Sequence, residues 1–558
     1  MRSLCFTVTL LLSTLSLSVC DDVIASVTCD HTGSCSLHNG IVKNYVAKGK
    51  FRNEINSTGW SFLEISTEGS FPDEYQAYAA GVVEGHLTKE LMRMAWVNTV
   101  AGYCDEPLTP YCQRLRKYLN DNLVWMKQQI KNNMEDDYWR MVNNYLVQVN
   151  GLNDGYFYKP GTSLSGTGSI VADIDPMGVF MFQIGGDLED LGEALGDTAR
   201  KHVLGSGSCS ALIKLTPDDA DLYFSHDTWN SYQSMIRVIK RYNFAYHTKS
   251  SGKLIPGAAM TFTSYPGTLL SGDDFYIISS GLAVQETTIG NSNSDLWKFV
   301  RPQSVLEGIR TMVSNLLATN GDTWTNVFTK YNSGTYNNQW MVVDYKRFKP
   351  NSKNMTSLLY VLEQIPGYIV SNDVTDVLMK QSYWPSYNIP YYPKIFNMSG
   401  GPSMVEQFGE WFSYDGSPRA KIFKRDHGKV VDMKSMIRLM RYNDYTHDPL
   451  SRCNCTPPYS AENAISARCD LNPASGTYPF GALGHRSHGG TDMKLTNSSM
   501  AVNLQFVSIS GPTYDQLPPF QWSKADFRFD TPHEGQPDLF KFDPILYDGT
   551  TNYRLYKP

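Results

Sequence analysis

The segment from residue 209 to residue 229 constrains the fold more than any other, because it predicts two strands joined by a tight turn. Residues 211–215 (ALIKL) and 220–229 (ADLYFSHDTW) are rich in residues that favour strands. They are separated by TPDDA, in which Pro217 and two aspartates favour a turn. We therefore predict an antiparallel hairpin that begins at Cys209 and whose second strand brings His226 back towards that cysteine.

The segments on either side of the hairpin have different patterns. Before it, residues 205–208 (GSGS) contain two glycines, which give the backbone freedom, so this run is a linker, a turn or a place where the chain is cut. After it, the sequence WNSYQSMIRVIKRYNF spaces its apolar residues as a helix does. We predict an amphipathic helix over residues 229–244 that packs on the sheet.

The N-terminus predicts export from the cytosol. Residues 1–20 combine one arginine with an uncharged apolar stretch, which is the pattern of a signal peptide cleaved after Cys20 or after Ala25. No later apolar run is long enough to span a membrane, so we expect no transmembrane anchor. Five acceptor triplets for N-linked glycans agree with a luminal or secreted protein: Asn56, Asn354, Asn397, Asn454 and Asn497.

The composition excludes one class of partner. The chain has 558 residues, 41% of them hydrophobic and 19% charged, which is ordinary for a globular protein. Its formal net charge of −6 provides no basic surface for nucleic acid. We expect no nucleic-acid partner.

Eight cysteines remain after the leader, and in an oxidising compartment they tend to pair. Short spacings predict bonds between Cys29 and Cys35 and between Cys104 and Cys112. In the last group we expect Cys469 to pair with Cys453 or Cys455, with Cys455 as the partner we favour. Cys209 has no cysteine near it in the sequence. It is a buried inert thiol, half of a long-range disulfide, or a nucleophile.

A nucleophilic role for Cys209 needs a base, and a cut before this residue would supply one. Cleavage of the Ser208–Cys209 bond leaves a free α-amino group, whose unperturbed pKa is about 7.7 to 8.0. Such a group takes and returns a proton near neutral pH more easily than a lysine does. In this hypothesis the thiol attacks the carbonyl of Ser208, and water then releases the new N-terminus.

Several long segments carry a resemblance to a known family. GSCSALIKL, SHDTW, TSYPGTLLSGDDFY, GLAVQETTIGN, YNIPYYPKIFNMSG, MRYNDYTHDP and SARCDLNP closely resemble segments of the phospholipase B-like proteins, in the same order along the chain. The resemblance implies an α+β fold like that of the N-terminal nucleophile hydrolases, an αββα sandwich of two stacked antiparallel sheets between helical layers. It also implies one precursor that cuts itself into residues 21–208 and 209–558, which together form one globular domain without a cofactor.

The resemblance also implies roles for individual residues. Cys209 matches the nucleophile, and Ser208–Cys209 is the bond to be cut. His226 matches the histidine of the segment H-x-T-W. Asn388 and Arg419 resemble residues that line the pocket, with Asn388 as a donor to the oxyanion, and Trp229 is expected to form a wall.

Other groups of polar residues have a plainer interpretation. His485, His488 and Asp492 form a conceivable metal set, but no known ligand spacing connects them, so we predict a loop that is solvated or structurally bonded, and no metal. Asp273 and Asp274 stand before a strand-like segment, where they are turn residues or a carboxyl pair for acid–base work. The chain has no Gly-x-Ser-x-Gly, which excludes the usual serine lipase motif.

Three functions remain open. The first is a lysosomal or secreted acyl hydrolase that removes fatty acyl chains from glycerophospholipids through a Cys209 acyl-enzyme. The second is an amidase that acts on N-acyl lipids or small peptides with the same residues. The third is a glycosylated binding protein without catalysis. The cleaved fragment is expected to stay bound as a second chain, and a homodimer is left open.

Overall fold

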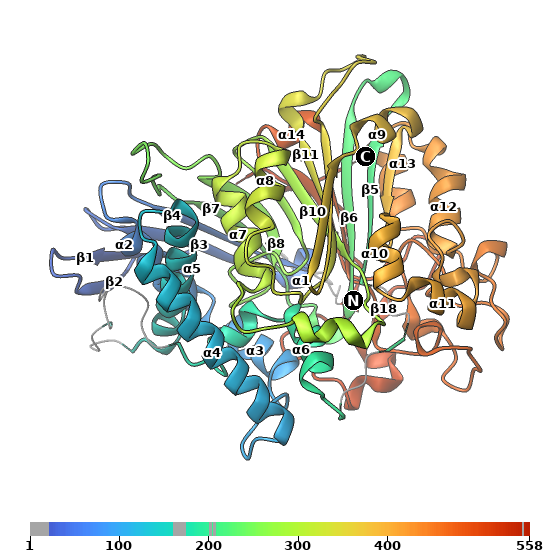
Figure 1. Cartoon of the computed structure of the whole chain (residues 1–558), viewed down its shortest axis with the longest axis horizontal. Helices are drawn as coiled ribbons and strands as arrows, with labels where there is room; N and C mark the ends of the chain where they lie inside the picture. The colour runs from blue at the N-terminus through green and yellow to red at the C-terminus, as the bar shows by residue number, and fades with distance from the viewer. Residues whose placement is uncertain are drawn as a thin grey trace, which may run out of the picture.

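The computed structural model describes residues 22–159, 164, 174–199, 203–204, 208–549 and 552–557. The predicted signal peptide, residues 1–20, and the glycines of the run before Cys209 lie outside these residues. The described chain has a mixed α+β fold with two large sheets and helices packed on them (Figure 1). No helix in this part of the chain is both long and apolar enough to cross a bilayer.

The larger sheet has 11 strands in the order β13-β12-β11-β10-β9-β8-β7-β4-β3-β1-β2. Its pairs are antiparallel except for β4 with β7. The strands are β1 (Val23–Cys29), β2 (Cys35–Asn39), β3 (Ala47–Glu54), β4 (Trp60–Thr67), β7 (Val238–Asn243), β8 (Ala259–Ser264), β9 (Phe275–Ile278), β10 (Leu282–Thr288), β11 (Asn338–Asp344), β12 (Leu359–Ile365) and β13 (Tyr368–Asp373).

The second sheet has 8 strands in the order β14-β5-β6-β16-β17-β20-β21, with β15 paired to β6. Its strands are β5 (Cys209–Leu215), β6 (Leu222–Ser231), β14 (Tyr383–Ser386), β15 (His488–Gly490), β16 (Asp492–Thr496), β17 (Phe506–Ser510), β20 (Ile545–Tyr547) and β21 (Tyr553–Leu555). A separate pair joins β18 (Phe520–Gln521) to β19 (Leu539–Phe540).

Three apolar clusters hold these layers together. One contains residues of both sheets, such as Ile213 and Phe224 with Ile277 and Val343, and lies between them. Another joins the larger sheet to helices α2, α4, α5, α7 and α8, and a third joins the smaller sheet to α12 and α13. Figure 1 shows α2 and α5 on the opposite side of the molecule from α12 and α13.

The helices have the following bounds: α1 (Ile55–Thr58), α2 (Asp73–Leu87), α3 (Lys89–Thr99), α4 (Pro110–Asn132), α5 (Asp137–Phe157), α6 (Asp187–Leu195), α7 (Glu307–Leu317), α8 (Gly321–Phe328), α9 (Thr375–Gln381), α10 (Pro393–Met398), α11 (Gly401–Phe408), α12 (Pro418–Asp426), α13 (Met433–Met440) and α14 (Ser498–Ala501).

The predicted hairpin is confirmed, and the predicted helix after it is wrong. Strands β5 and β6 pair in antiparallel register, with Cys209 opposite Thr228 and Ala211 opposite His226. Residues 229–244 instead form the end of β6, a short 3-10 turn and β7. Strand β7 forms because it pairs with β4 on one side and β8 on the other. These backbone partners, which are distant in sequence, override the helical spacing of its apolar residues.

Two of the predicted disulfides are confirmed, Cys29–Cys35 and Cys104–Cys112. The third prediction is wrong, because Cys453 pairs with Cys455 and Cys469 is a buried free thiol. Cys453 packs beside the cluster around Phe480, whereas Cys469 packs with Trp229 and Ala467, so the two cysteines belong to different apolar clusters.

The five glycan acceptors differ in their surroundings. Asn56, Asn354, Asn397 and Asn454 are exposed. Asn497 is half-buried, and its side-chain nitrogen donates a hydrogen bond of 2.9 Å to Asp221. Four acceptors therefore have the accessibility that the glycan prediction needs, and a glycan on Asn497 would compete with this bond.

Close packing of α2 on α5 generates a stability prediction. A Cβ atom on Gly151 would lie 2.1 Å from the backbone oxygen of Tyr78, which cannot move aside without shifting the helix. We expect Gly151→Ala to lower the free energy of unfolding by about 1 to 3 kcal/mol, the usual cost of overpacking. In the control Gly192→Ala on α6, the nearest atom would be 3.8 Å away. That variant should be neutral or slightly stabilising in thermal unfolding. Equal stability of the two variants would contradict the packing argument.

Candidate active site at the start of strand β5

The backbone of Ser208 and Cys209 is held at three atoms, one in the peptide between these residues and one in each of the two flanking peptides. The carbonyl of Ser208 accepts a hydrogen bond of 2.5 Å from the backbone N–H of Trp229, which extends the β5–β6 ladder by one pair. The N–H of Ser208 donates to Oδ1 of Asn388 at 3.2 Å, and the carbonyl of Cys209 accepts from Nη1 of Arg419 at 2.6 Å. This peptide therefore has a fixed orientation.

Arg419 and Asn388 come from different elements and meet at this peptide. Arg419 stands in the first turn of α12, and its Nη2 donates to Oδ1 of Asn388 at 2.7 Å. Because an arginine offers only donors, the Asn388 atom that faces it is the oxygen. The Asn388 nitrogen then donates to the carbonyl of Thr288 at 2.7 Å. In the uncut chain the donor to the Ser208 carbonyl is consequently Trp229 N–H. The role of Asn388 towards an oxyanion stays a prediction.

Trp229, which the resemblance implies as a wall residue, lines the larger of two cavities beside Ser208. Its ring lies 4.2 Å below the guanidinium carbon of Arg419, and its indole nitrogen donates to the carbonyl of Ile465 at 3.2 Å. Both residues are buried. Burial lowers the pKa of Arg419 to about 10, so it remains charged at neutral pH. The structure thus brings together Ser208, Cys209, Trp229, Asn388 and Arg419, as the resemblance implies.

His226 occupies a different position in the same hairpin. It pairs with Ala211 and not with Cys209, and it is fully buried. Its Nε2 faces the backbone oxygen of Glu286 on β10 at 2.9 Å, which requires a proton on that nitrogen, and its Nδ1 lies 3.4 Å from the hydroxyl of Thr228. Burial and the charge of Lys494 keep the pKa of His226 well below its usual range. His226 is therefore a neutral bridge between the two sheets, with both nitrogens engaged.

A buried ion network lies beside Cys209 that sequence reasoning missed. Lys494 Nζ contacts Asp492 at 2.8 Å and donates to the hydroxyl of Thr228 at 2.5 Å. Arg237 pairs with Asp492 at 2.6 Å and also with Asp273. All four charged side chains have no exposed surface. The sequence did contain one signal for this network: Asp492 and Lys494 are two residues apart in one strand, so their side chains lie on the same face of the sheet and can pair.

The thiol of Cys209 is protonated in this environment. It is 4% exposed, and burial together with the nearby carboxyl of Glu286 raises its pKa well above the usual range. Lys494 and the backbone N–H of Trp229 act in the opposite direction but are smaller effects. An attack by this sulfur therefore needs a base to remove the proton.

Two cavities meet beside Ser208. One, of about 400 Å³, is lined by Asn388 and Arg419 and by apolar and aromatic side chains that include Trp297, Phe396, Met404 and Trp411. The other, of about 630 Å³, is lined by Cys209, Thr228 and Trp229. Ser208, Thr288 and Tyr336 line both. Aromatic residues near positions 396 and 411 thus line the smaller cavity.

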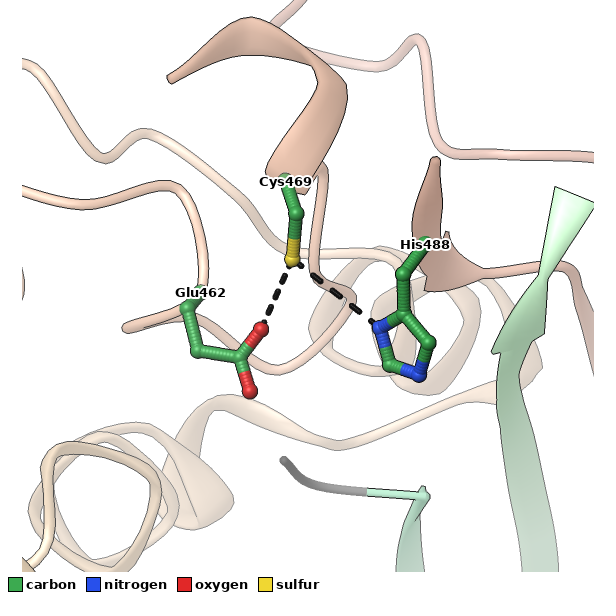
Figure 2. A group of neighbouring side chains, drawn as sticks. All are labelled: Glu462, Cys469 and His488. Atoms are coloured by element: carbon green, nitrogen blue, oxygen red, sulfur yellow. Dashed lines mark hydrogen bonds between the residues drawn. The ribbon is translucent and has the colours of Figure 1, made fainter. Parts of the chain in front are cut away.

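Figure 2 shows a second polar group, formed by Glu462, Cys469 and His488. The Cys469 thiol donates to Glu462 at 2.8 Å and lies 4.0 Å from Nδ1 of His488. This is the one group in the described part of the chain whose His, Cys and acidic atoms are close enough to hold a metal ion. Arg486 Nη2 already contacts Glu462 at 3.1 Å and Cys469 at 3.6 Å. The carboxylate therefore has a resident positive partner, and the geometry does not require an ion.

The histidines considered from the sequence do not form a metal set. His485 contacts Asp526 at 3.0 Å, whereas Asp492 belongs to the ion network with Lys494 and Arg237. His488 lies with Glu462 and Cys469 instead (Figure 2). The loop around residue 485 is hydrogen-bonded, as predicted.

The ion network generates a stability prediction. Lys494→Met removes the ammonium but keeps a chain of similar length, which leaves Asp492 and Thr228 without that partner in a buried place. We expect a loss of about 3 to 5 kcal/mol in the free energy of unfolding, measured by urea denaturation. The control is Lys421→Met, whose ion pair with Glu410 is exposed at 43% and 80% and should contribute less than about 1 kcal/mol. Similar small losses in both variants would show that the network is dispensable.

Comparison with known proteins shows the family of this chain. The family model for Phospholipase B matches residues 47–547. Phospholipase B-like 2 of Mus musculus is 51% identical over 521 residues, which cover 92% of this chain and 87% of the relative. Phospholipase B-like 1 of Caenorhabditis elegans is 45% identical, with 92% and 90% covered, and phospholipase B-like protein B of Dictyostelium discoideum is 38% identical, with 93% and 88% covered. The chain belongs to the phospholipase B family.

Proposed function

We propose that the chain is a hydrolase that cuts its own Ser208–Cys209 bond and then uses Cys209 to remove acyl chains from glycerophospholipids. The observation that carries the proposal is the backbone of Ser208 and Cys209, held by Trp229, Asn388 and Arg419 next to a thiol that forms no disulfide. The names of the relatives support the substrate class.

The self-cleavage begins with attack of the Cys209 sulfur on the Ser208 carbonyl carbon. Negative charge then develops on the Ser208 oxygen, where the N–H of Trp229 is already in place as a donor. The C–N bond breaks, the amide becomes a thioester, and water releases the carboxylate of Ser208. Cys209 then begins the second chain with a free α-amino group.

In the matured protein this α-amino group is the base for the thiol. Its unperturbed pKa of about 7.7 to 8.0 suits a group that takes the thiol proton and returns it to the leaving group. A substrate carbonyl takes the place of the Ser208 carbonyl, near the N–H of Trp229 and the side chain of Asn388. This arrangement is that of an N-terminal nucleophile hydrolase, with two sheets between helical layers.

The two cavities suit a substrate with two chemically different ends. Apolar side chains around Phe396, Met404 and Trp411 offer a place for an acyl chain, since ligand pockets are mostly apolar with a few polar groups. Arg419 supplies a permanent positive charge at the same cavity for a phosphate or another anion. Departure of Ser208, which lines both cavities, would join them at the nucleophile.

An amidase is the second candidate, because the site already holds an amide. The Ser208–Cys209 peptide lies against the same donors that would receive a substrate, so N-acyl lipids or small peptides fit the same mechanism.

The two cleaved parts should remain together. Strands β1 to β4 precede the cut and β7 to β13 follow it, yet they form one sheet. Opening one peptide bond removes none of this packing. The leader, the exposed glycan acceptors and the disulfides support a lysosomal or secreted location.

The first test concerns the cut. The wild type should separate under denaturation into two chains, and N-terminal sequencing of the larger one should begin at Cys209. Cys209→Ala should stay as one chain, whereas Cys469→Ala, which removes the other buried thiol, should still be cut. A start well away from residue 209, or a cut in the Cys209→Ala protein, would refute the nucleophile.

The second test concerns the substrate. Matured protein should release fatty acid from a phospholipid, and alkylation of Cys209 should abolish the release. Asn388→Ala should depress turnover by about a hundred-fold to a thousand-fold if its amide serves the oxyanion. Faster hydrolysis of an N-acyl amide than of the ester would favour the amidase. No turnover of either, with maturation intact, would favour a binding protein.

A further inference from the structure

Two buried carboxyl groups lie side by side behind Tyr336, a residue that lines the larger cavity. Asp274 stands directly before β9 and Glu286 stands in β10, and the N–H of Glu286 donates to the carbonyl of Asp274 at 3.3 Å. Both side chains have no exposed surface, and their carboxyls are within hydrogen-bond reach of each other. Asp274 has the left-handed φ of 55° that a turn residue can adopt, and its carboxyl is buried.

Tyr336 connects this pair to the site of the cut. Its hydroxyl donates to Asp274 at 2.5 Å and lies 3.5 Å from Glu286. Tyr336 also lines both cavities, together with Ser208. Its φ of 50° is unusual for a bulky residue, and its ring lies where a Cβ on Gly186 would come within 2.4 Å. Such backbone strain persists only where the surroundings impose it, which is common at functional sites.

The carboxyl pair has no ion-pair partner in the described part of the chain. Asp274 Oδ1 and Glu286 Oε2 accept no hydrogen bond from any described donor. Lys494 is bound to Asp492 and Thr228, and Arg310 donates to backbone carbonyls, Ser333 and Gln364. A single proton shared between the two carboxyls would give one oxygen of each a partner, and two like charges at this distance cannot both persist in a buried place.

Burial and the neighbouring acidic groups raise the carboxyl pKa values, whereas the hydroxyl of Tyr336 and the charge of Lys494 act in the opposite direction. Burial raises the pKa of Asp274 to about 6, and burial with the charge of Asp274 raises the pKa of Glu286 well above its usual range. A third buried acid, Glu307 at the start of α7, lies next to the pair. Other titratable and charged groups face the pair or Glu307: Cys209 and His226 of the hairpin, Asp273 and Tyr276 beside Asp274, Asp187 of α6, Arg310 of α7, Tyr336, and Lys494 of β16. The acidic groups among them favour retention of a proton.

Self-cleavage needs a base and an acid at once, before the α-amino group exists. The thiol proton of Cys209 must leave, and the nitrogen of Cys209 must gain a proton when its bond to Ser208 breaks. His226 is neutral with both nitrogens engaged, and Lys494 is held by Asp492. The carboxyl pair contributes to the electrostatics of the Cys209 thiol and reaches the cavity through Tyr336.

We propose that Asp274 and Glu286 share one proton and, through the hydroxyl of Tyr336, act as the base and the acid of the self-cleavage. The S–C bond forms while the ionised carboxyl accepts the thiol proton, and the C–N bond breaks while the protonated carboxyl supplies one proton to the Cys209 nitrogen. The pair holds one proton before and after, so the step balances. This inference rests on the proposed self-cleavage and adds the groups that perform it.

The test follows the rate of the cut against pH. Freshly translated full-length chain is incubated at pH values from 4 to 8, and the cut fraction is measured over time. The wild type should show a bell-shaped profile: at low pH both carboxyls are protonated and no base remains, and at high pH both are ionised and no acid remains. Glu286→Gln and Asp274→Asn should each cut about a hundred-fold more slowly or worse, with the bell lost.

The control is Glu363→Gln, which removes a different buried carboxyl from the same sheet. Glu363 lies in β12, accepts from Gln339 and the backbone of Tyr391, and has a pKa raised by burial to about 7. It lines neither cavity, so its variant should keep the wild-type profile. A general effect of buried carboxyls on folding would slow all of these variants alike and would overturn the inference.

If the carboxyl variants fail to fold, Tyr336→Phe still tests the inference, because it removes only the hydroxyl oxygen and keeps the ring. We expect cutting about ten-fold slower or worse and a shifted profile. An unchanged rate and profile, in a wild type that is cut before Cys209, would overturn the inference and leave the proposed self-cleavage intact. A wild type that is not cut there would overturn both.

Discussion

The buried ion pairs between the two sheets allow polar side chains to lie beside Cys209 in an otherwise apolar layer. The layer between the sheets is mostly apolar, and an unpaired charge there would cost several kcal/mol. Lys494, Asp492, Arg237 and Asp273 neutralise one another beside Thr228, directly opposite Cys209 in the ladder. Water is not needed to solvate these groups. A polar group such as the Cys209 thiol can therefore lie at the end of an apolar layer without loosening the contact between the sheets.

Local patterns were sufficient for the hairpin but not for the strand after it. The turn at Pro217 and the β-rich segments around it carry their own signal, and β5 and β6 form as predicted. Strand β7 has no such local signal. It pairs with β4 and β8, and its Lys240 and Tyr242 bind Glu84 of α2, which lies 156 and 158 residues away in the sequence. A helical spacing of apolar residues cannot reveal a buried carboxylate that distant.

Distance along the sequence also decides which parts of the candidate site could be predicted and which could not. The resemblance supplied Cys209, Trp229, Asn388 and Arg419, although contacts across 180 and 210 residues could not be derived from spacing. It did not supply the orientation of the Asn388 amide, which Arg419 and Thr288 decide together. The error at Cys469 has a similar origin, since its hydrogen bond to Glu462 and its packing on Trp229 are tertiary contacts.

If the chain is cut as proposed, the raised pKa of the Cys209 thiol protects the sulfur before the cut and also makes its attack harder. A thiolate is the reactive form of cysteine, and in an oxidising compartment it would exchange with disulfides or oxidise. Burial and Glu286 keep the sulfur protonated in the uncut chain. The proposed cleavage would replace the neutral amide at the same residue with an α-amino group, whose positive form favours the thiolate. The cut would therefore create the base and raise the reactivity of the sulfur in one step. Before the cut that base is absent, so the proposed reaction needs a proton acceptor among the surrounding side chains, and the buried carboxyls behind Tyr336 are suited to that use.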